Sequence, residues 1–251
     1  MDKQDILIFY KKYKKFMNYP SGMPKIYPVY DIVDERIRTP LAFVHTDEMM
    51  KNKVPLHISH ELLEYNKKYR RSILFHEFTH ILDWYVTLKD FDMSKRIKLM
   101  ASYSEFHASQ IELLSYLYKN IELVQPYFDM DTIIKFKNEK LDIEKTIIYP
   151  MVDASIILKK EKDAYKDLSR DNFNKKYMIA FSNVMYYLGK YRICELYGNR
   201  KPHNFFYEFG VFKNTIMKLY DALIINNYNG ILYYKNSFMM EYLNYFEQKS
   251  N

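Results

Sequence analysis

ILFHEFTHIL, at residues 73–82, places a His-Glu-x-x-His sequence inside a run of uncharged residues. An α-helix turns about 100° per residue, so His76 and His80 lie one turn apart on one face and can direct two imidazole nitrogens at the same ion. Glu77 lies one step round the helix, where its carboxylate can reach a water on such an ion without binding the ion itself. The spacing therefore predicts a helix that presents two metal ligands and a general base to a cleft.

This stretch resembles the zinc-binding helix of the zincin metallopeptidases, and the motif-level resemblance covers residues 73 to about 112. The resemblance implies Zn²⁺ as the cofactor and peptide-bond hydrolysis as the activity, with His76 and His80 as ligands and Glu77 as the general base. The alternative is a chance string on an ordinary amphipathic helix, whose histidines are satisfied by local hydrogen bonds.

A catalytic zinc site needs three protein ligands, and the predicted helix supplies two. Glu105 follows His80 by 25 positions, and small residues follow it on its own helical face, which would let two helices approach closely. The pattern resembles the glutamate-ligand branch of the zincins, the gluzincins, and also the compact ImmA/IrrE-type metallopeptidases of mobile elements. On a helix His107 would lie about 200° round from Glu105, and Glu112 about 10 Å farther along the axis. Glu105 is the preferred third ligand, and His107 and Glu112 stay open as alternatives.

Asp83 lies on nearly the same helical face as the two histidines and is a candidate for the residue that orients a ligating imidazole by a hydrogen bond. The alternative is a surface aspartate. Asp83 and Val86 also replace the glycine and histidine that the metzincin motif requires there. Cys194 lies far downstream of the motif, whereas a peptide deformylase would use an upstream cysteine ligand.

A polar-aromatic cluster lies farther along the chain, within the sequence YYLGKYR at residues 186–192. One of its members could stabilise the oxyanion of a tetrahedral intermediate. The candidates taken from this cluster are Tyr187, Tyr191 and Arg192. The alternative for each is ordinary packing in the core.

Hydrophobic periodicity predicts an α+β fold, with a small mixed sheet before the active-site helix and a mainly helical C-terminal part. The resemblance to the zincins, which carry such a sheet before their zinc-binding helix, implies that this fold is zincin-like. An amphipathic helix is expected at residues 5–17, the active helix at about 66–86, and renewed helix from residue 94. The expected strands are 25–33, 40–45 and 54–59, and the expected later helices are 153–168, 174–196, 204–225 and 237–248. The domain prediction is a catalytic domain at 1–150 and a helical part at 151–251 that packs on it.

The resemblance implies that residues 56–59 form an edge strand that aligns an extended substrate by backbone hydrogen bonds, with Leu56 and Ile58 facing the core. Three histidines, His45, His57 and His60, lie in the same region. Each could be considered as an extra ligand, but we interpret them as ordinary strand or turn residues.

The composition of the 251-residue chain limits the remaining classes of function. Its apolar runs are shorter than the roughly 18 residues that span a bilayer, so we expect no membrane span. Its first residues do not read as a signal peptide, so we expect no export. A single cysteine, Cys194, excludes an internal disulfide and favours the reducing cytoplasm. The net charge of +7 comes from lysines scattered among acidic residues, so nucleic acid is not the expected partner.

These observations predict a cytoplasmic zinc metallopeptidase. We expect it to be an endopeptidase that cleaves an intracellular protein or peptide substrate. The alternative is a non-catalytic, metal-containing binding or regulatory protein with a basic, tyrosine-rich surface, since the chain contains 26 tyrosines. The sequence does not specify an oligomeric state.

Overall fold

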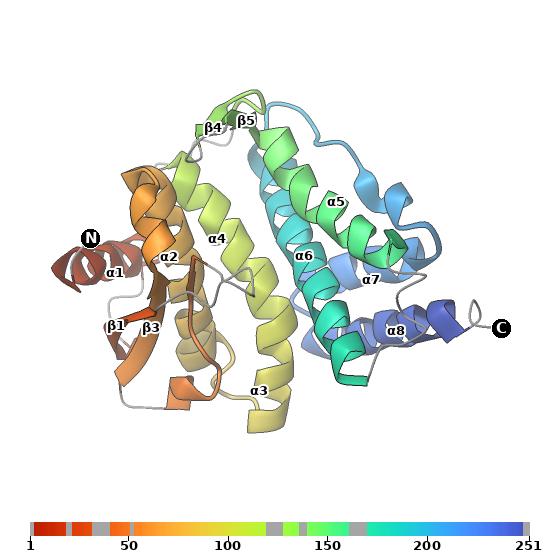
Figure 1. Cartoon of the computed structure of the whole chain (residues 1–251), viewed down its shortest axis with the longest axis horizontal. Helices are drawn as coiled ribbons and strands as arrows, with labels where there is room; N and C mark the ends of the chain where they lie inside the picture. Colours follow the sequence, from red (N-terminus) through yellow and green to blue (C-terminus); the bar gives the residue numbers. More distant parts are fainter. Residues whose placement is uncertain are drawn as a thin grey trace.

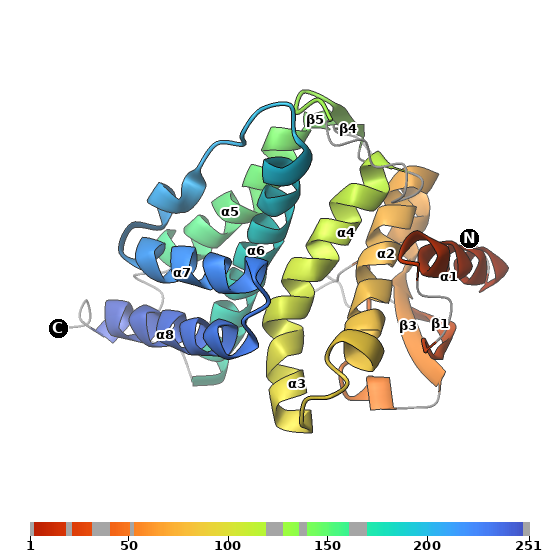
Figure 2. The same cartoon turned by 180° about the vertical axis from the view of Figure 1, so that it is seen from behind.

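The computed structural model describes residues 3–18, 22–31, 41–50, 53–118, 128–135, 140–160 and 170–247. It has an α+β fold that is mainly helical and carries small sheets, which confirms the predicted class at that level. Figures 1 and 2 show α4 (Glu105–Leu117) running through the middle of the molecule, between α2 (Lys67–Leu82) and α6 (Arg170–Tyr197). Helix α4 packs on both of these helices, so it joins the N-terminal and C-terminal parts of the fold.

The N-terminal sheet has three strands in the order β1-β3-β2, namely β1 (Lys25–Asp31), β3 (Lys53–Ser59) and β2 (Ala42–Phe43). Strand β3 pairs in parallel with β1 and antiparallel with β2. Leu56 and Ile58 are fully buried, as expected. The prediction that residues 56–59 form an edge strand was wrong, because β3 lies in the centre and β2 lies at the edge of the described sheet.

Helix α2 is fixed at its start by Asn66, whose side-chain oxygen accepts hydrogen bonds from the backbone N–H groups of Lys68 and Tyr69, both at 3.0 Å. Its second half is buried on all sides. Helix α1 (Lys3–Phe16) covers one of these sides, and the Tyr13 hydroxyl donates to Thr79 Oγ1 at 3.1 Å. After Leu82 the helix continues as a π-helical turn, Asp83–Thr87, so helical backbone covers nearly all of the predicted segment.

Gly189 explains why α6 approaches α4 so closely. A Cβ atom at this position would lie 2.0 Å from Ser109 Oγ and 2.3 Å from the Phe106 carbonyl oxygen, distances that no side chain can occupy. The absence of a side chain therefore lets the two helix backbones pack together. This contact sets which face of α6 lies against α4.

The C-terminal part consists of α5 (Ile143–Lys160), α6, a 3-10 helix at Phe205–Phe212, α7 (Lys213–Ile224) and α8 (Tyr228–Glu247). Helix α5 begins ten residues before the predicted start at 153 and carries Pro150 inside it, so the predicted boundary at residue 150 falls within a helix. The predicted residues 161–168 lie outside the described part of the chain. Helix α8 also begins earlier than the predicted residue 237.

The remaining elements are short. They are α3 (Met93–Leu99) with a π-helical turn at Met100–Ser104, the 3-10 turns Glu48–Met50 and His60–Glu64, and a hairpin of β4 (Ile133–Lys135) and β5 (Lys140–Asp142). Among the described helices, none combines the length and the apolar character that a bilayer crossing requires.

Candidate metal centre

His76 and His80 occupy successive turns of α2 and face each other through their Nε2 atoms, which lie 3.1 Å apart. Both side chains are buried, with 2% and 7% of the residue exposed. The four-residue spacing therefore places two imidazole nitrogens at one point, as the sequence predicted.

Glu105 is the first residue of α4 and reaches the same point from the neighbouring helix. Its Oε2 lies 3.6 Å from His76 Nε2, and its Oε1 lies 3.7 Å from His80 Nε2. One ligand atom from each of the three residues lies within 4.8 Å of the others. Glu105 Oε2 is buried and has no hydrogen-bond partner among the described residues, so this group leaves one buried oxygen for a further ligand.

Glu112, an alternative third ligand, lies behind His76. Its Oε2 is 3.1 Å from His76 Nδ1, the nitrogen on the side of the ring away from His80, and its Oε1 is 3.0 Å from Lys190 Nζ. Glu112 therefore occupies the position of a residue that orients a ligating imidazole. The sequence interpretation considered Glu112 only as a ligand and missed this position.

His107, the other alternative, points away from the three converging side chains. Its Nδ1 lies 2.9 Å from Asp83 Oδ1, and Asp83 is completely buried. Asp83 therefore contacts neither of the two imidazoles that it was predicted to orient, which corrects that prediction. Ser104 takes the place at His80 instead, with its Oγ 2.8 Å from His80 Nδ1.

Glu77 is the residue next to His76 and lines the same cavity as both histidines. Only 7% of it is exposed, and Val44, just beyond β2, lines the same cavity. Burial raises the pKa of Glu77 to about 8, and the nearby carboxylates of Glu105 and Glu112 act in the same direction. The site thus holds a carboxyl group whose pKa lies near neutral pH.

The pKa values of the two imidazoles are shifted in opposite directions. Burial lowers the pKa of His80 to about 4. Burial also acts to lower the pKa of His76, but the carboxylates of Glu105 and Glu112, which face its two ring nitrogens, outweigh it and raise that pKa to about 10. The carboxylates around His76 thus favour positive charge at this point, which a proton or a metal cation can supply.

Tyr186 brings a hydroxyl group to the site from α6. Its oxygen lies 2.9 Å from His76 Nε2, and its ring stacks on the His76 ring with centroids 4.9 Å apart. Burial and the surrounding carboxylates raise the pKa of Tyr186 well above its usual value, so the hydroxyl keeps its proton. Tyr186 belongs to the predicted polar-aromatic cluster but was not among the selected oxyanion candidates.

The three selected candidates lie elsewhere, which corrects the oxyanion prediction. Tyr187 and Tyr191 each pack on Phe206, and Arg192 pairs with Glu195 at 2.9 Å. None of the three lines the cavity of the histidines.

Helical phase explains the difference between the two neighbouring tyrosines. Gly189 faces α4, and Tyr187 lies two residues away, about 200° round the helix. Tyr186 lies three residues from Gly189 and about 60° from the same face. The sequence could distinguish Tyr186 from Tyr187 only if Gly189 were known to be the point where α6 contacts α4.

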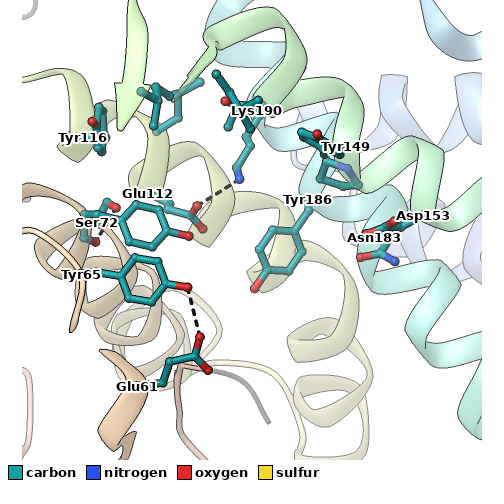
Figure 3. A pocket seen from close by; sticks show the side chains of 16 residues that line it. Glu61, Tyr65, Ser72, Glu112, Tyr116, Tyr149, Asp153, Asn183, Tyr186 and Lys190 are labelled. Carbon is teal, nitrogen blue, oxygen red and sulfur yellow. Dashed lines mark hydrogen bonds and ion pairs between the residues drawn. The ribbon is translucent and has the colours of Figure 1, made fainter. Parts of the chain in front are cut away.

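The converging side chains lie in a cavity of about 790 Å³ that adjoins a second cavity of about 720 Å³. The two share six lining residues, which are Tyr69, Glu112, Asp153, Asn183, Tyr186 and Lys190. Figure 3 shows the second cavity, with Lys190 reaching Glu112, and with Tyr65, Tyr116 and Tyr149 round it. We call the second cavity the tyrosine chamber. The cleft therefore continues well beyond the histidines.

Searches of protein-family models, curated proteins and solved structures found no match to this chain. The functional proposal below therefore rests on the geometry of the site.

The two glutamates make a discriminating pair of variants. Glu105→Gln should weaken the binding of zinc to the cleft much more than Glu112→Gln, because Glu105 faces the Nε2 atoms and Glu112 faces Nδ1. Loss of an orienting residue alone reduces metal affinity by about 10- to 100-fold. Competition with a chromophoric chelator would measure both affinities. If only Glu112→Gln lost the metal, the assignment of the two glutamates would be reversed.

Proposed function

We propose that this protein is a zinc-dependent metallopeptidase that hydrolyses peptide bonds within a protein substrate. The observation that carries the proposal is the convergence of His76, His80 and Glu105 from two helices, with Glu77 beside them in the same cavity. The order of a small sheet, a His-Glu-x-x-His helix and a later glutamate also matches the zincin resemblance.

The donor set fits zinc. Two imidazole nitrogens and one carboxylate oxygen are the ligands of many catalytic zinc sites, whereas Mg²⁺ and Ca²⁺ prefer oxygen donors alone. The unpartnered buried oxygen of Glu105 and the surplus of carboxylates at His76 both favour a cation at this point. His76, His80 and Glu105 would hold the ion, and Glu112 and Ser104 would orient the two rings.

The bound zinc would supply a Lewis acid and lower the pKa of its water towards about 7. Glu77 would accept a proton from the attacking water and later deliver it to the nitrogen of the leaving amine. Tyr186 would donate its hydroxyl proton in a hydrogen bond to the oxyanion of the tetrahedral intermediate. The high pKa of Tyr186 supports its role as a hydrogen-bond donor, because a donor must stay protonated.

The shape of the cleft favours an extended segment of a protein over a dipeptide. Strand β2 lies at the edge of the sheet beside Glu77, and residues 41–44 line the cavity of the histidines. A substrate strand that paired with β2 could continue into the tyrosine chamber. This assigns to β2 the role that the sequence interpretation gave to residues 56–59.

Tyr186→Phe should retain zinc and lower kcat by about 10²- to 10³-fold, the usual cost of removing one oxyanion donor. Tyr187→Phe is the matched control, because it removes the neighbouring hydroxyl, which lies about 100° round the same helix and does not line the cavity of the histidines. Steady-state kinetics and zinc content of both variants would test the role. Equal rates for the two variants would remove Tyr186 from the mechanism.

The proposed function can be tested by removing and restoring the metal. The chain should cleave fluorescently labelled, unfolded casein when it is zinc-loaded, lose this activity in a chelator, and regain it with added Zn²⁺. A zinc-loaded chain that binds unfolded protein without cleaving it would support a non-catalytic binding protein instead.

A further inference from the structure

We propose that His45, Glu48 and His57 form a second site for a zinc-like transition-metal ion, on the rim of the cleft. The three residues lie outside the His76 centre, and one ligand atom from each lies within 4.8 Å of the others. This site does not depend on the proposed catalytic function.

Strand pairing and the neighbouring Phe43 fix the position of the His57 ring. Phe43 of β2 pairs with His57 of β3, and their rings stack with centroids 4.7 Å apart and planes 6° from parallel. His45 follows Phe43 by two residues, and its ring lies 5.0 Å from that of His57. Phe43 thus packs against one face of the His57 ring and limits its rotation.

A 3-10 turn brings the carboxylate to the two imidazoles. The backbone N–H of Glu48 donates to the His45 carbonyl oxygen at 3.1 Å, which turns the chain back towards β3. Glu48 Oε2 then lies 2.8 Å from His57 Nε2. Glu48 and His57 are thus already held together.

The donor set selects the class of ion. Two imidazoles and one carboxylate suit zinc and neighbouring transition metals, and they suit Mg²⁺ or Ca²⁺ poorly. Ligands on a tetrahedral zinc lie roughly 3.3 to 3.6 Å apart, given zinc-ligand distances of about 2.0 to 2.2 Å. Small side-chain rotations would close the present spacing. His45 is exposed, so water has access to a remaining coordination position.

The position of the cluster connects it to the cleft. Val44, beside His45, lines the cavity of the histidines together with Thr46 and Met49. The Tyr85 hydroxyl donates to the Met49 carbonyl oxygen. An ion at this rim site would fix residues 43–50 against β3 and so hold this wall of the cavity in place.

The test is the zinc stoichiometry of the full chain, stripped of metal and then equilibrated with Zn²⁺ by dialysis. The wild type should bind two equivalents per chain, and His45→Ala and Glu48→Gln should each bind one. His60→Ala is the matched control from the same region, since His60 stacks on Tyr30 away from the cluster, and it should keep both. Circular dichroism would establish that each variant is folded.

Two results would overturn the rim site: a single equivalent in the wild type that His76→Ala removes, or two equivalents that persist in both His45→Ala and Glu48→Gln. The two metal proposals fail separately. A single equivalent that His45→Ala removes would leave the rim site standing and reject zinc in the cleft. Titration of Mg²⁺ should give no binding to either histidine cluster, because imidazole is a poor ligand for that ion.

Discussion

Glu77→Gln should keep the cleft zinc and lower peptide hydrolysis by about 10²- to 10⁴-fold, the range that a positioned general base contributes. The amide has nearly the shape of the carboxylate but cannot accept the proton of the attacking water. Glu77 lies where such a loss is expected, since it is buried and lines the cavity of the histidines. The measurement is kcat on an unfolded protein substrate, together with zinc content.

Glu61→Gln is the control for this variant. Glu61 is an exposed glutamate that lines the tyrosine chamber, so the same chemical change is made in the same cleft but away from the histidines. Its kcat should stay near that of the wild type, because Glu61 lies where substrate would bind and not beside the histidines, so the change is expected to act on KM. A Glu77→Gln enzyme that retained activity within a few-fold of wild type would reject Glu77 as the base.

His76→Ala and His80→Ala should each abolish tight zinc binding in the cleft, because a site with one imidazole and one carboxylate has too few ligands. The loss should exceed the about 100-fold that removal of an orienting residue can cause. These variants are best made in a His45→Ala background, so that the rim site does not contribute zinc. Elemental analysis after dialysis measures the effect, and His60→Ala in the same background is the control. Undiminished zinc in both variants would reject the cleft site.

The parts of the fold that depend on local pattern were predictable. The spacing of His76 and His80 determines that their side chains meet, and Asn66 marks the start of α2 by a local hydrogen bond. Buried alternation likewise identified β3. Which strand lies at the sheet edge depends on pairing between segments far apart in the chain, so the edge strand was assigned wrongly.

The surroundings of the two imidazoles could not be predicted in the same way. Glu112 and Ser104 reach them from other elements, and their positions depend on how α4 packs on α2. Asp83 lies on the right helical face, but it pairs with His107, which the neighbouring helix presents to it. Helical spacing alone cannot distinguish between such partners, because it fixes direction within a helix but not the distance to the next one.

The choice of Tyr187 over Tyr186 failed for a related reason. The two residues are adjacent and chemically alike, and only the face that α6 turns towards α4 separates them. That face is fixed by the absence of a side chain at Gly189, through its close contact with Phe106 and Ser109.

We propose that this protein cuts peptide bonds within other proteins by means of Glu77 and a zinc ion in the cleft. The most direct measurement is to incubate the zinc-loaded wild type and Glu77→Gln with the proteins of an expression-host lysate and to compare new protein termini by mass spectrometry. Internal cleavages, within extended segments, should appear with the wild type and be absent with Glu77→Gln. The absence of any Glu77-dependent internal cleavage, alongside efficient hydrolysis of small dipeptides by the wild type, would rule out cleavage within proteins and favour an exopeptidase.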